Sequence, residues 1–455
     1  MDGYKGDVGV KTQPSSVGLA GNARSMSASA TMSGLISDHI RRQIAGYETA
    51  APCKVDDVTT KSESALPDLL QAAVLVVQEI MENDIDRQQL DERLADLFER
   101  QASLYYKLPI SNEHRKKQYI SRHGLVMSPD QCITTQLDSL RVRAYIRGIH
   151  AALTNLASRV TGPIHIVYPA CGPFAPLLLP LLAYYHNEHL YTPDELRVTL
   201  IDMQPGAILA LRALLAEQNL EDYIHAVVCQ DAVDYQPDMP VHLVVLEAMQ
   251  HGFSREGHLV IARHFARIME PDGEFIPHKV TVRAVLNVGQ REYVDQWKDV
   301  AGCSEGEMNQ QIKDERTDLG EILEVTPASL RKMEMELLDE FTSLVKCGCV
   351  QVPELSRDHD KQLLLICSEV QTYELERVGE YDSGITHPLP DEQVCINFQP
   401  HSHRPGDLLV KSGDRLRFYY CINGLPGFMA TIESHVDKSR EVDSQKVDSQ
   451  EGGYE

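Results

Sequence analysis

The sequence predicts an α/β protein with a parallel sheet in its central part and a mostly antiparallel β-domain after it. Two observations lead to this fold class. Between Ile164 and Glu247, short apolar runs alternate with helix-length segments, which is the signature of βα units on a parallel sheet. After Pro277 the pattern changes to strand-like runs separated by turns, which is typical of antiparallel sheets. We expect strands at 164–168, 198–201, 225–229 and 241–246, and helices at 177–185, 207–218 and 257–269.

Composition and charge limit the possible functions. The chain has 455 residues, enough for two or three domains, and its 43% of hydrophobic residues is ordinary for a globular protein. A net charge of −24 disfavours nucleic acid and anionic membranes as partners and favours cationic ones. The ten cysteines are scattered, and the one close pair, Cys347 and Cys349, lacks the second pair of a zinc site. We therefore expect no metal, and reduced thiols in a cytoplasmic protein.

The N-terminal region changes character near residue 65. Residues 1–64 are poor in apolar side chains and lack the apolar segment of a secretory signal, so we expect a flexible tail. In two later stretches, 66–81 and 85–106, apolar residues recur at i, i+3, i+4 and i+7, which predicts two amphipathic helices. These helices either cap the following domain or form an added helical module. The longest apolar run, 175–185, is far shorter than the roughly 20 residues that a membrane span needs.

Carboxylates follow three of the expected strands. Asp202 ends the second strand, Asp231 follows the third and Glu247 follows the fourth. Ligands of open α/β sheets bind at the carboxyl ends of the strands, and an acid that ends the second strand can accept hydrogen bonds from both hydroxyls of a ribose. The turn after the first strand, 169–173, has Gly172 as its only glycine and so offers few N–H donors to a pyrophosphate. A nucleoside without phosphates fits better, which points to S-adenosylmethionine.

Three motifs give the chain a resemblance to a known family. They are D-x-x-R-x-x-x-Y in a helix expected at 135–158, two glutamates nine residues apart after the fourth strand, and a P-x-G-x-x-x-P turn. The matching residues are Asp138, Arg141, Tyr145, Glu247, Glu256, Pro271, Gly273 and Pro277. In these motifs the chain resembles the protein arginine methyltransferases, a family of class I S-adenosylmethionine-dependent methyltransferases, over residues 110–430. The resemblance implies a Rossmann-like domain followed by a β-barrel-like domain with a helical arm.

The resemblance also implies which residues bind S-adenosylmethionine. Asp202 would hold the ribose, Asp231 the adenine amino group, and Gly172 would let the backbone approach the nucleoside. Arg141 would bind the carboxylate of the methionine moiety through two parallel hydrogen bonds. Other interpretations stay open, because Asp202 and Asp231 can cap the helices that follow them and Arg141 can form a surface ion pair with Asp138.

Glu247 and Glu256 are the expected catalytic residues. Two carboxylates can hold a guanidinium between them, localise its charge and accept the proton that methylation releases. The alternative is that Glu256 only favours the N-terminal end of the helix at 257–269, while Glu247 lies free in a loop. The loop departs from the family in two ways. His-Gly-Phe at 251–253 replaces the aromatic residues that the family has there, and Arg255 stands where it can neutralise Glu256.

The later part of the chain suggests an assembly. Residues 289–344 show helical periodicity where the family carries an arm that grips a second subunit, so we expect a homodimer; a lid or packing subdomain is the alternative. The family's Thr-His-Trp loop has its nearest counterpart in His401 or His403, although a solvated loop histidine is the simpler interpretation. The expected divisions are a flexible tail at 1–64, a helical segment at 65–110, a Rossmann-like methyltransferase domain at 111–277, a β-barrel-like domain at 278–434 with a helical insertion at 289–344, and a disordered tail at 435–455.

The function implied by the resemblance is transfer of a methyl group from S-adenosylmethionine to a guanidino nitrogen of an arginine in a protein or peptide. A cationic acceptor of this kind agrees with the acidic charge of the chain. Two other functions remain open. Methylation of a small molecule of secondary metabolism is one, because the site loops depart from the family. A non-catalytic, methyltransferase-like scaffold is the other, and the glycine-poor turn after the first strand supports it.

Overall fold

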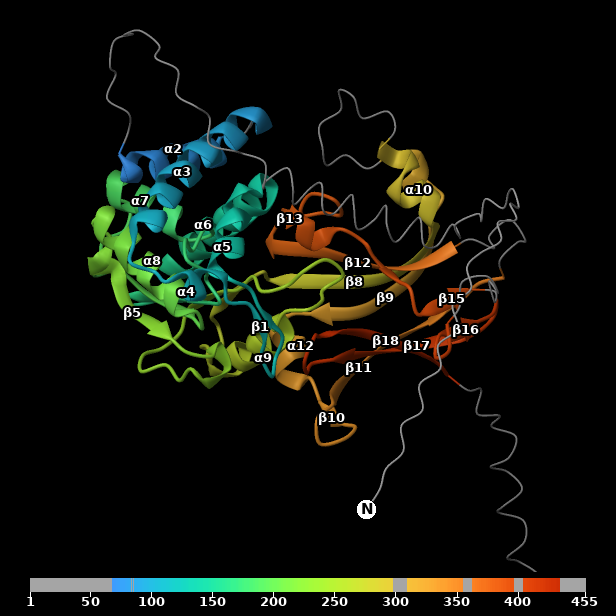
Figure 1. Cartoon of the computed structure of the whole chain (residues 1–455). Coiled ribbons are helices and arrows are strands. Elements are labelled where there is room, and N and C mark those ends of the chain that lie inside the picture. Colours follow the sequence, from blue (N-terminus) through green and yellow to red (C-terminus); the bar gives the residue numbers. More distant parts are fainter. Residues whose placement is uncertain are drawn as a thin grey trace, which may run out of the picture. The chain divides into compact units, whose positions relative to one another are not determined.

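The structure is a computed structural model that describes residues 68–82, 84, 86–297, 309–354, 362–396 and 404–433. The tails expected at 1–64 and 435–455 lie outside these ranges, as do His401 and His403. The described chain contains an N-terminal pair of helices, a parallel sheet with helices, and antiparallel sheets (Figure 1). Within these ranges, no helix combines the length and the apolarity that crossing a bilayer requires.

Two helices open the described chain, as the periodicity predicts. They are α2 (Leu69–Met81) and α3 (Arg87–Lys107). Asp68 caps α2 by accepting a hydrogen bond from a first-turn backbone N–H at 2.7 Å. The apolar face of α2, which includes Val77 and Ile80, is fully buried and packs against α7 (Leu179–Glu188) of the next domain. The helices therefore cap the α/β domain and share its core, and they do not form a separate module.

Five parallel strands form the predicted central sheet, in the order β5-β4-β3-β6-β7. All six residues of β3 are buried, as expected for a strand covered on both faces. The strands and helices agree with the predicted ranges, with ends shifted by a few residues. Their bounds are β3 (Ile164–Pro169), β4 (Leu196–Asp202), α8 (Pro205–Glu217), β5 (Ile224–Cys229), β6 (Leu243–Val245), α9 (His258–Ile268) and β7 (Glu274–Ile276).

The strand order reverses beside β3. The chain runs from β3 to β4 and β5 on one side of the sheet and then returns to β6 and β7 on the other side. A reversal of this kind opens a crevice at the carboxyl end of the sheet, where ligands bind. Asp202 is the last residue of β4 and Glu247 lies just beyond β6, so both carboxylates belong to this edge.

Two antiparallel sheets follow. One has the order β13-β12-β8-β9, with β14 paired to β12, and the other has the order β10-β11-β17-β18. They approach closely at Gly348, where an added Cβ would lie 2.9 Å from the Cα of Ile322. In the described ranges the two sheets do not join into one hydrogen-bonded ring, so a closed barrel is not what we find. The bounds are β8 (Lys279–Val288), β9 (Thr317–Val325), β10 (Glu336–Leu337), β11 (Ser343–Gln351), β12 (Gln362–Tyr373), β13 (Glu376–Val378), β14 (Leu389–Asp391), β17 (Arg415–Cys421) and β18 (Gly427–Ile432). A separate parallel pair is formed by β15 (Val394–Ile396) and β16 (Leu408–Val410).

The expected helical insertion at 289–344 needs correction, because strand β9 lies inside it. The sequence here has a helical period, with apolar residues at i, i+3 and i+4 (Leu319, Ile322 and Leu323). The backbone nevertheless forms a strand that pairs with β8, with two irregularities of register. Non-local pairing therefore overrides the local period. The helical pieces that remain are α10 (Gly289–Tyr293), α11 (Gln310–Asp314) and α12 (Pro327–Lys332), while 298–308 lies outside the described residues.

Helix α6 (Ser139–Ala157) connects the parallel sheet with the antiparallel part of the molecule. An added Cβ at Gly148 would lie 2.8 Å from the Thr372 hydroxyl of β12, so the missing side chain permits this close approach. The same hydroxyl donates a hydrogen bond to the Ala144 carbonyl oxygen at 2.7 Å. This packing brings the N-terminal end of α6, with Asp138 and Arg141, to the boundary between the two parts.

Candidate functional site

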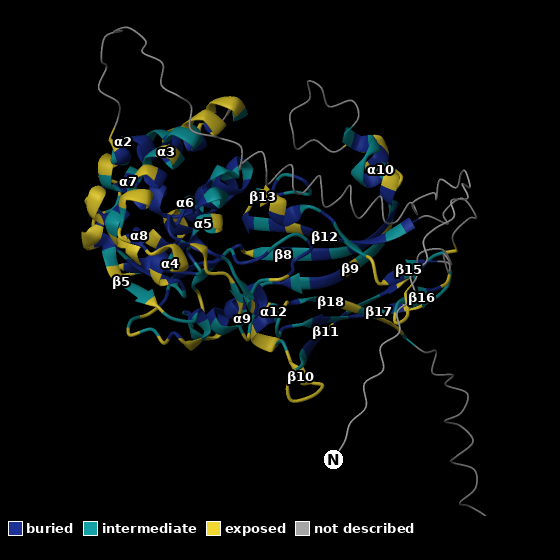
Figure 2. Cartoon of the chain, in the orientation of Figure 1, coloured by how far each residue is buried: buried dark blue, intermediate teal, exposed yellow. Residues whose placement is uncertain are grey.

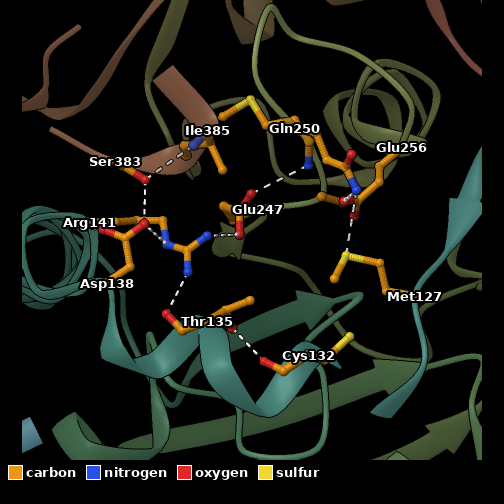
Figure 3. A network of polar contacts seen from close by, with 12 residues as sticks. Met127, Cys132, Thr135, Asp138, Arg141, Glu247, Gln250, Glu256, Ser383 and Ile385 are labelled. Carbon is orange, nitrogen blue, oxygen red and sulfur yellow. Dashed lines mark hydrogen bonds and ion pairs between the residues drawn. The ribbon is translucent and has the colours of Figure 1, made fainter. Parts of the chain in front are cut away.

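The candidate site lies where the N-terminal end of α6 meets the loop after β6 (Figure 3). Asp138 is the N-cap of α6, and its Oδ1 accepts a hydrogen bond from the Arg141 backbone N–H at 3.4 Å. Its Oδ2 accepts a hydrogen bond from the Ser383 hydroxyl at 2.5 Å. Ser383 follows β13, so one carboxylate ties the helix that carries Arg141 to the antiparallel part of the chain.

Arg141 is held by three groups. Its Nη1 lies 3.0 Å from Oε2 of Glu247, its Nη2 donates to the Thr135 carbonyl oxygen at 2.5 Å, and its Nε lies 3.7 Å from Oδ2 of Asp138. The side chain is only 5% exposed, so the ion pair with Asp138 is buried and not on a solvated surface. Although burial opposes it, the two carboxylates hold the pKa of Arg141 above its ordinary value. Among the described residues, Nε has no hydrogen-bond partner, so its N–H is available to a further carboxylate.

Asp202 supports the turn after β3. Its Oδ2 accepts a hydrogen bond from the Gly172 N–H at 3.0 Å, and its Oδ1 accepts one from the Gln204 N–H at 2.7 Å. Gly172 has a φ of +67°, a conformation that favours glycine. Burial raises the pKa of Asp202 to about 6, and the two backbone hydrogen bonds oppose the rise. The N-cap of α8 is Gln204, and no side chain caps this helix, so Asp202 is not its cap; each carboxylate oxygen keeps a second lone pair for a ligand hydroxyl.

Asp231 caps the short 3₁₀ turn that follows β5. Its Oδ1 accepts a hydrogen bond from the Val233 N–H at 3.1 Å, so the capping interpretation is correct for Asp231. Its Oδ2 lies 3.8 Å from Nε of Arg122, which belongs to a hairpin formed by β1 (Tyr119–Ile120) and β2 (Leu125–Val126). The adenine role that we expected for Asp231 stays a prediction.

Glu247 and Glu256 form an asymmetric pair. Burial raises the pKa of Glu256 to about 8, and the charge of Glu247 adds to the rise. Burial also raises the pKa of Glu247, but the Arg141 guanidinium opposes that rise. The Glu256 Oε1 accepts a hydrogen bond from the Gln250 Nε2 at 3.0 Å. A pKa of about 8 favours the protonated form of Glu256 at neutral pH. Glu247 is the ion-pair partner of Arg141, so it is not free in a loop.

The loop between these glutamates is fixed by the antiparallel part of the chain. The Phe253 ring is fully buried, with its centroid 5.5 Å from the Tyr420 ring of β17. An added Cβ at Gly252 would lie 2.5 Å from the Cβ of Leu389. The Arg255 N–H donates to the Pro426 carbonyl oxygen at 2.7 Å, and the Arg255 side chain is exposed. Among the described residues Arg255 and Glu256 form no ion pair, but the charge of Arg255 still lowers the pKa of Glu256, as the smallest of the influences on it.

Two segments that border the site were not predicted from the sequence. The first is the hairpin of β1 and β2, whose Leu125 N–H donates to the Arg255 carbonyl oxygen at 2.8 Å. Its signal was the Arg-His-Gly turn between two short apolar runs. The second is the loop 383–387, which contains Ser383 and a Thr-His pair at Thr386 and His387. This pair is a closer match to the Thr-His-Trp loop than His401 or His403, which lie outside the described residues.

The residues of the site fit a nucleoside cofactor with a carboxylate. Among the described residues, the hydroxyl of Tyr145 is buried and has no hydrogen-bond partner. It lies close enough to Glu247 and Arg141 for their charges to influence its pKa, which burial raises well above the ordinary value. Buried polar atoms without partners are uncommon, so this hydroxyl and the Arg141 Nε are suited to contact a polar group of a ligand.

Comparison with known proteins gives distant similarities to solved structures only. No protein-family model and no curated protein matches the sequence. Among solved structures, the chain is similar to the PRMT1 enzyme–prozyme heterotetrameric complex with AdoHcy from Trypanosoma brucei, with a TM-score of 0.38 and 12% identity. The match covers 67% of this chain and 94% of that chain. A likeness of this size assigns no activity to the chain, and the function below is derived from its own residues.

Proposed function

We propose that this chain is an S-adenosylmethionine-dependent methyltransferase that methylates a guanidino nitrogen of arginine in a peptide or protein. The observation that carries the proposal is the asymmetric pair of Glu247 and Glu256 beside Arg141, at the carboxyl edge of a parallel sheet. Pairs of carboxyl groups whose pKa values are driven apart by their surroundings are typical of acid–base sites. The strongly acidic charge of the chain also favours a cationic acceptor.

Four residues would hold the cofactor. Asp202 has lone pairs available for the ribose hydroxyls, and Gly172 lets the backbone of the turn approach the nucleoside. Arg141 offers its free Nε–H to the methionine carboxylate. Asp231 is the candidate for the adenine amino group. When bound, S-adenosylmethionine supplies a methyl group on a positively charged sulfonium, so that transfer needs only a correctly placed nucleophile.

The two glutamates would position that nucleophile. A guanidinium has two edges of parallel N–H groups, and one carboxylate can take each edge. The glutamates would turn one guanidino nitrogen towards the methyl group that S-adenosylmethionine supplies, and the proton that this nitrogen loses would pass to Glu256. Glu256, with a pKa of about 8 in the free protein, becomes a base of suitable strength once the cation displaces its proton.

Two measurements test the proposal together. Calorimetric titration with S-adenosylhomocysteine should show binding, and mass spectrometry should show methylation of arginine-containing peptides. Glu256→Gln should lower turnover by on the order of 10²-fold, because small misplacements of reacting groups cost that much. It should leave the affinity for S-adenosylhomocysteine unchanged, and Glu217→Gln, at an exposed position of α8, serves as the matched control.

Glu247→Gln should behave differently from Glu256→Gln. Because Glu247 is the ion-pair partner of Arg141, its loss should weaken cofactor binding as well as turnover. A chain that does not bind S-adenosylhomocysteine would be a scaffold. A chain that binds it but never methylates arginine would be a methyltransferase of small molecules.

A further inference from the structure

A cluster of large apolar side chains stands exposed at the turn from β10 to β11. Leu337, Leu338 and Phe341 are 73%, 67% and 75% exposed, and Met335 is 38% exposed. We call residues 334–341 the β10 hairpin. Figure 2 shows it in the colour of exposed residues, projecting beyond the sheet that carries it. Grouped apolar exposure of this kind marks interaction surfaces, whereas single exposed apolar residues are ordinary.

The β10 hairpin is also strongly acidic. Its four carboxylates belong to Glu334, Glu336, Asp339 and Glu340, and no lysine or arginine occurs from 333 to 345. The guanidinium groups of two nearby arginines donate hydrogen bonds to backbone carbonyl oxygens. Arg331 donates to the Ala266 oxygen at 2.8 Å, and Arg263 donates to the Met333 oxygen at 3.2 Å. Lys332 and Lys346 flank the hairpin in the sequence, but none of the four carboxylates forms an ion pair among the described residues, so the surface combines anionic and bulky apolar groups.

A chain of contacts joins the β10 hairpin to the candidate site. Ser343, at the start of β11, accepts a hydrogen bond from the Ile422 N–H at 3.1 Å, and its own N–H donates to the Asn423 side chain at 2.6 Å. Asn423 lies in the turn between β17 and β18. The same turn presents the Pro426 carbonyl oxygen to the N–H of Arg255, the residue before Glu256. Leu425, also in this turn, is 44% exposed.

We propose that the β10 hairpin, together with Leu425, binds the part of a peptide substrate that flanks the methylated arginine, and that this part is cationic and carries bulky apolar side chains. The inference rests on the proposed function, for which it names the substrate class. The chemistry of the surface favours such a peptide, because its basic side chains would pair with the four carboxylates and its apolar side chains would pack on the leucines and Phe341. A second copy of the chain is a poor occupant, since symmetric contact would place these carboxylates against one another on a chain of net charge −24.

Fluorescence anisotropy with labelled synthetic peptides and the full-length protein, saturated with S-adenosylhomocysteine, tests the proposal. The probes are 20-residue peptides with one central arginine, flanked on the N-terminal or the C-terminal side by lysine, leucine and phenylalanine. The control peptide has the same arginine with glycine and serine flanks. One variant combines Leu337→Ser, Leu338→Ser and Phe341→Ser; the other combines Glu334→Gln, Glu336→Gln, Asp339→Asn and Glu340→Gln. Leu375→Ser, at a position 95% exposed next to β13, is the matched control.

Each multiple variant should bind one or both of the two flanked peptides at least about 10-fold more weakly than the wild type does, because several exposed contacts are lost together. Binding of the control peptide should not change, and neither should the behaviour of Leu375→Ser. Added salt should weaken the wild type more than the charge variant. All substituted side chains are exposed, so folding should be preserved.

Unchanged affinity of both multiple variants for both flanked peptides would overturn the proposal. So would a wild-type dimer that the triple serine variant converts to monomers in light scattering, because the occupant would then be a second copy. The proposed function fails separately, through absent binding of S-adenosylhomocysteine or absent methylation of the glycine and serine peptide. Neither of those results depends on the β10 hairpin.

Discussion

Asp202 and Glu256 show how similar burial gives two carboxyl groups different chemistry. Burial is the largest cause of the raised pKa of both groups. Asp202 receives two backbone N–H donors, which favour its anion and hold its pKa to about 6. Glu256 receives one side-chain donor from Gln250 and faces the charge of Glu247, so its pKa reaches about 8. Asp202 is thus suited to accept hydrogen bonds, and Glu256 to exchange a proton.

The raised pKa of Glu256 predicts opposite pH trends for stability and for activity. Its folded-state pKa of about 8 lies above the ordinary value of 4.5, so its contribution to stability is fully present below pH 4.5 and is lost as pH rises through about 8. Relative to Glu256→Gln, which does not titrate, the wild type should lose melting temperature between pH 5 and pH 9. Over the same range, kcat/KM of the wild type should rise as Glu256 ionises.

Thermal unfolding of both proteins at pH 5, 7 and 9 measures the first trend, and initial rates with an arginine peptide measure the second. Glu217→Gln should follow the wild type in both measurements. A constant difference in melting temperature between wild type and Glu256→Gln would show that Glu256 does not titrate in this range.

Asp202→Ala should remove cofactor affinity and also lower stability. The charge-assisted hydrogen bonds to the ribose are worth roughly 2–4 kcal/mol together, which corresponds to a loss of at least about 10-fold in affinity. The variant also leaves the Gly172 and Gln204 N–H groups without their acceptor, so the melting temperature should fall. Asp202→Asn, which keeps one acceptor oxygen, should be the more stable of the two. Calorimetry with S-adenosylhomocysteine decides the assignment, and unchanged affinity would remove Asp202 from the ribose site.

Helix α2 belongs to the core of the α/β domain, although it precedes the parallel sheet by many residues. Its buried face packs against α7, the helix that follows β3, and β3 leads directly into the turn at Gly172. The loop from Glu247 to Glu256 is supported in a comparable way by Phe253, which packs between the first helical turn of α9 and β17. Both elements thus depend on partners far away in the chain.

Ile80→Ala should destabilise the α/β domain as a whole. The side chain is fully buried, and removing its methyl groups from a packed interface costs about 2–5 kcal/mol. Gln78→Ala, on the exposed face of the same helix, should have almost no effect and controls for changes in helix propensity. Thermal unfolding with and without S-adenosylhomocysteine provides the comparison. If Ile80→Ala melts like the wild type, α2 does not contribute to this core.

The assembly of the whole chain remains a prediction from resemblance. The structure reduces the candidate arm to 289–316, because β9 pairs with β8 and cannot be part of an arm. Deleting 289–344 would therefore damage the sheet, so the intact chain is the one to measure. We expect light scattering at micromolar concentration to give twice the chain mass of 51.0 kDa. The mass of a monomer would leave these residues as a packing subdomain.

Local pattern was sufficient for the parallel sheet and for the edge on which the site lies. The apolar runs from Ile164 to Leu246 are continuous, and such runs can only be buried strands or helices, so their alternation fixes the order of elements. A carboxylate at the end of a buried strand must lie at the sheet edge, which places Asp202 and Glu247. The motif spacings likewise indicated Arg141 and Glu256 as candidates, and their roles stay predictions.

Contacts between distant residues decided everything that depends on a partner. The Arg141–Glu247 ion pair joins residues 106 positions apart, and the Ser383–Asp138 hydrogen bond joins residues 245 positions apart. No periodicity carries such information, because the pairing exists only once α6 has packed between the two parts of the molecule. The same reason explains why β9 is a strand: its sequence has a helical period, but pairing with β8 decides its structure. The raised pKa of Glu256 likewise arises from burial and from the approach of Glu247, which only the folded chain creates.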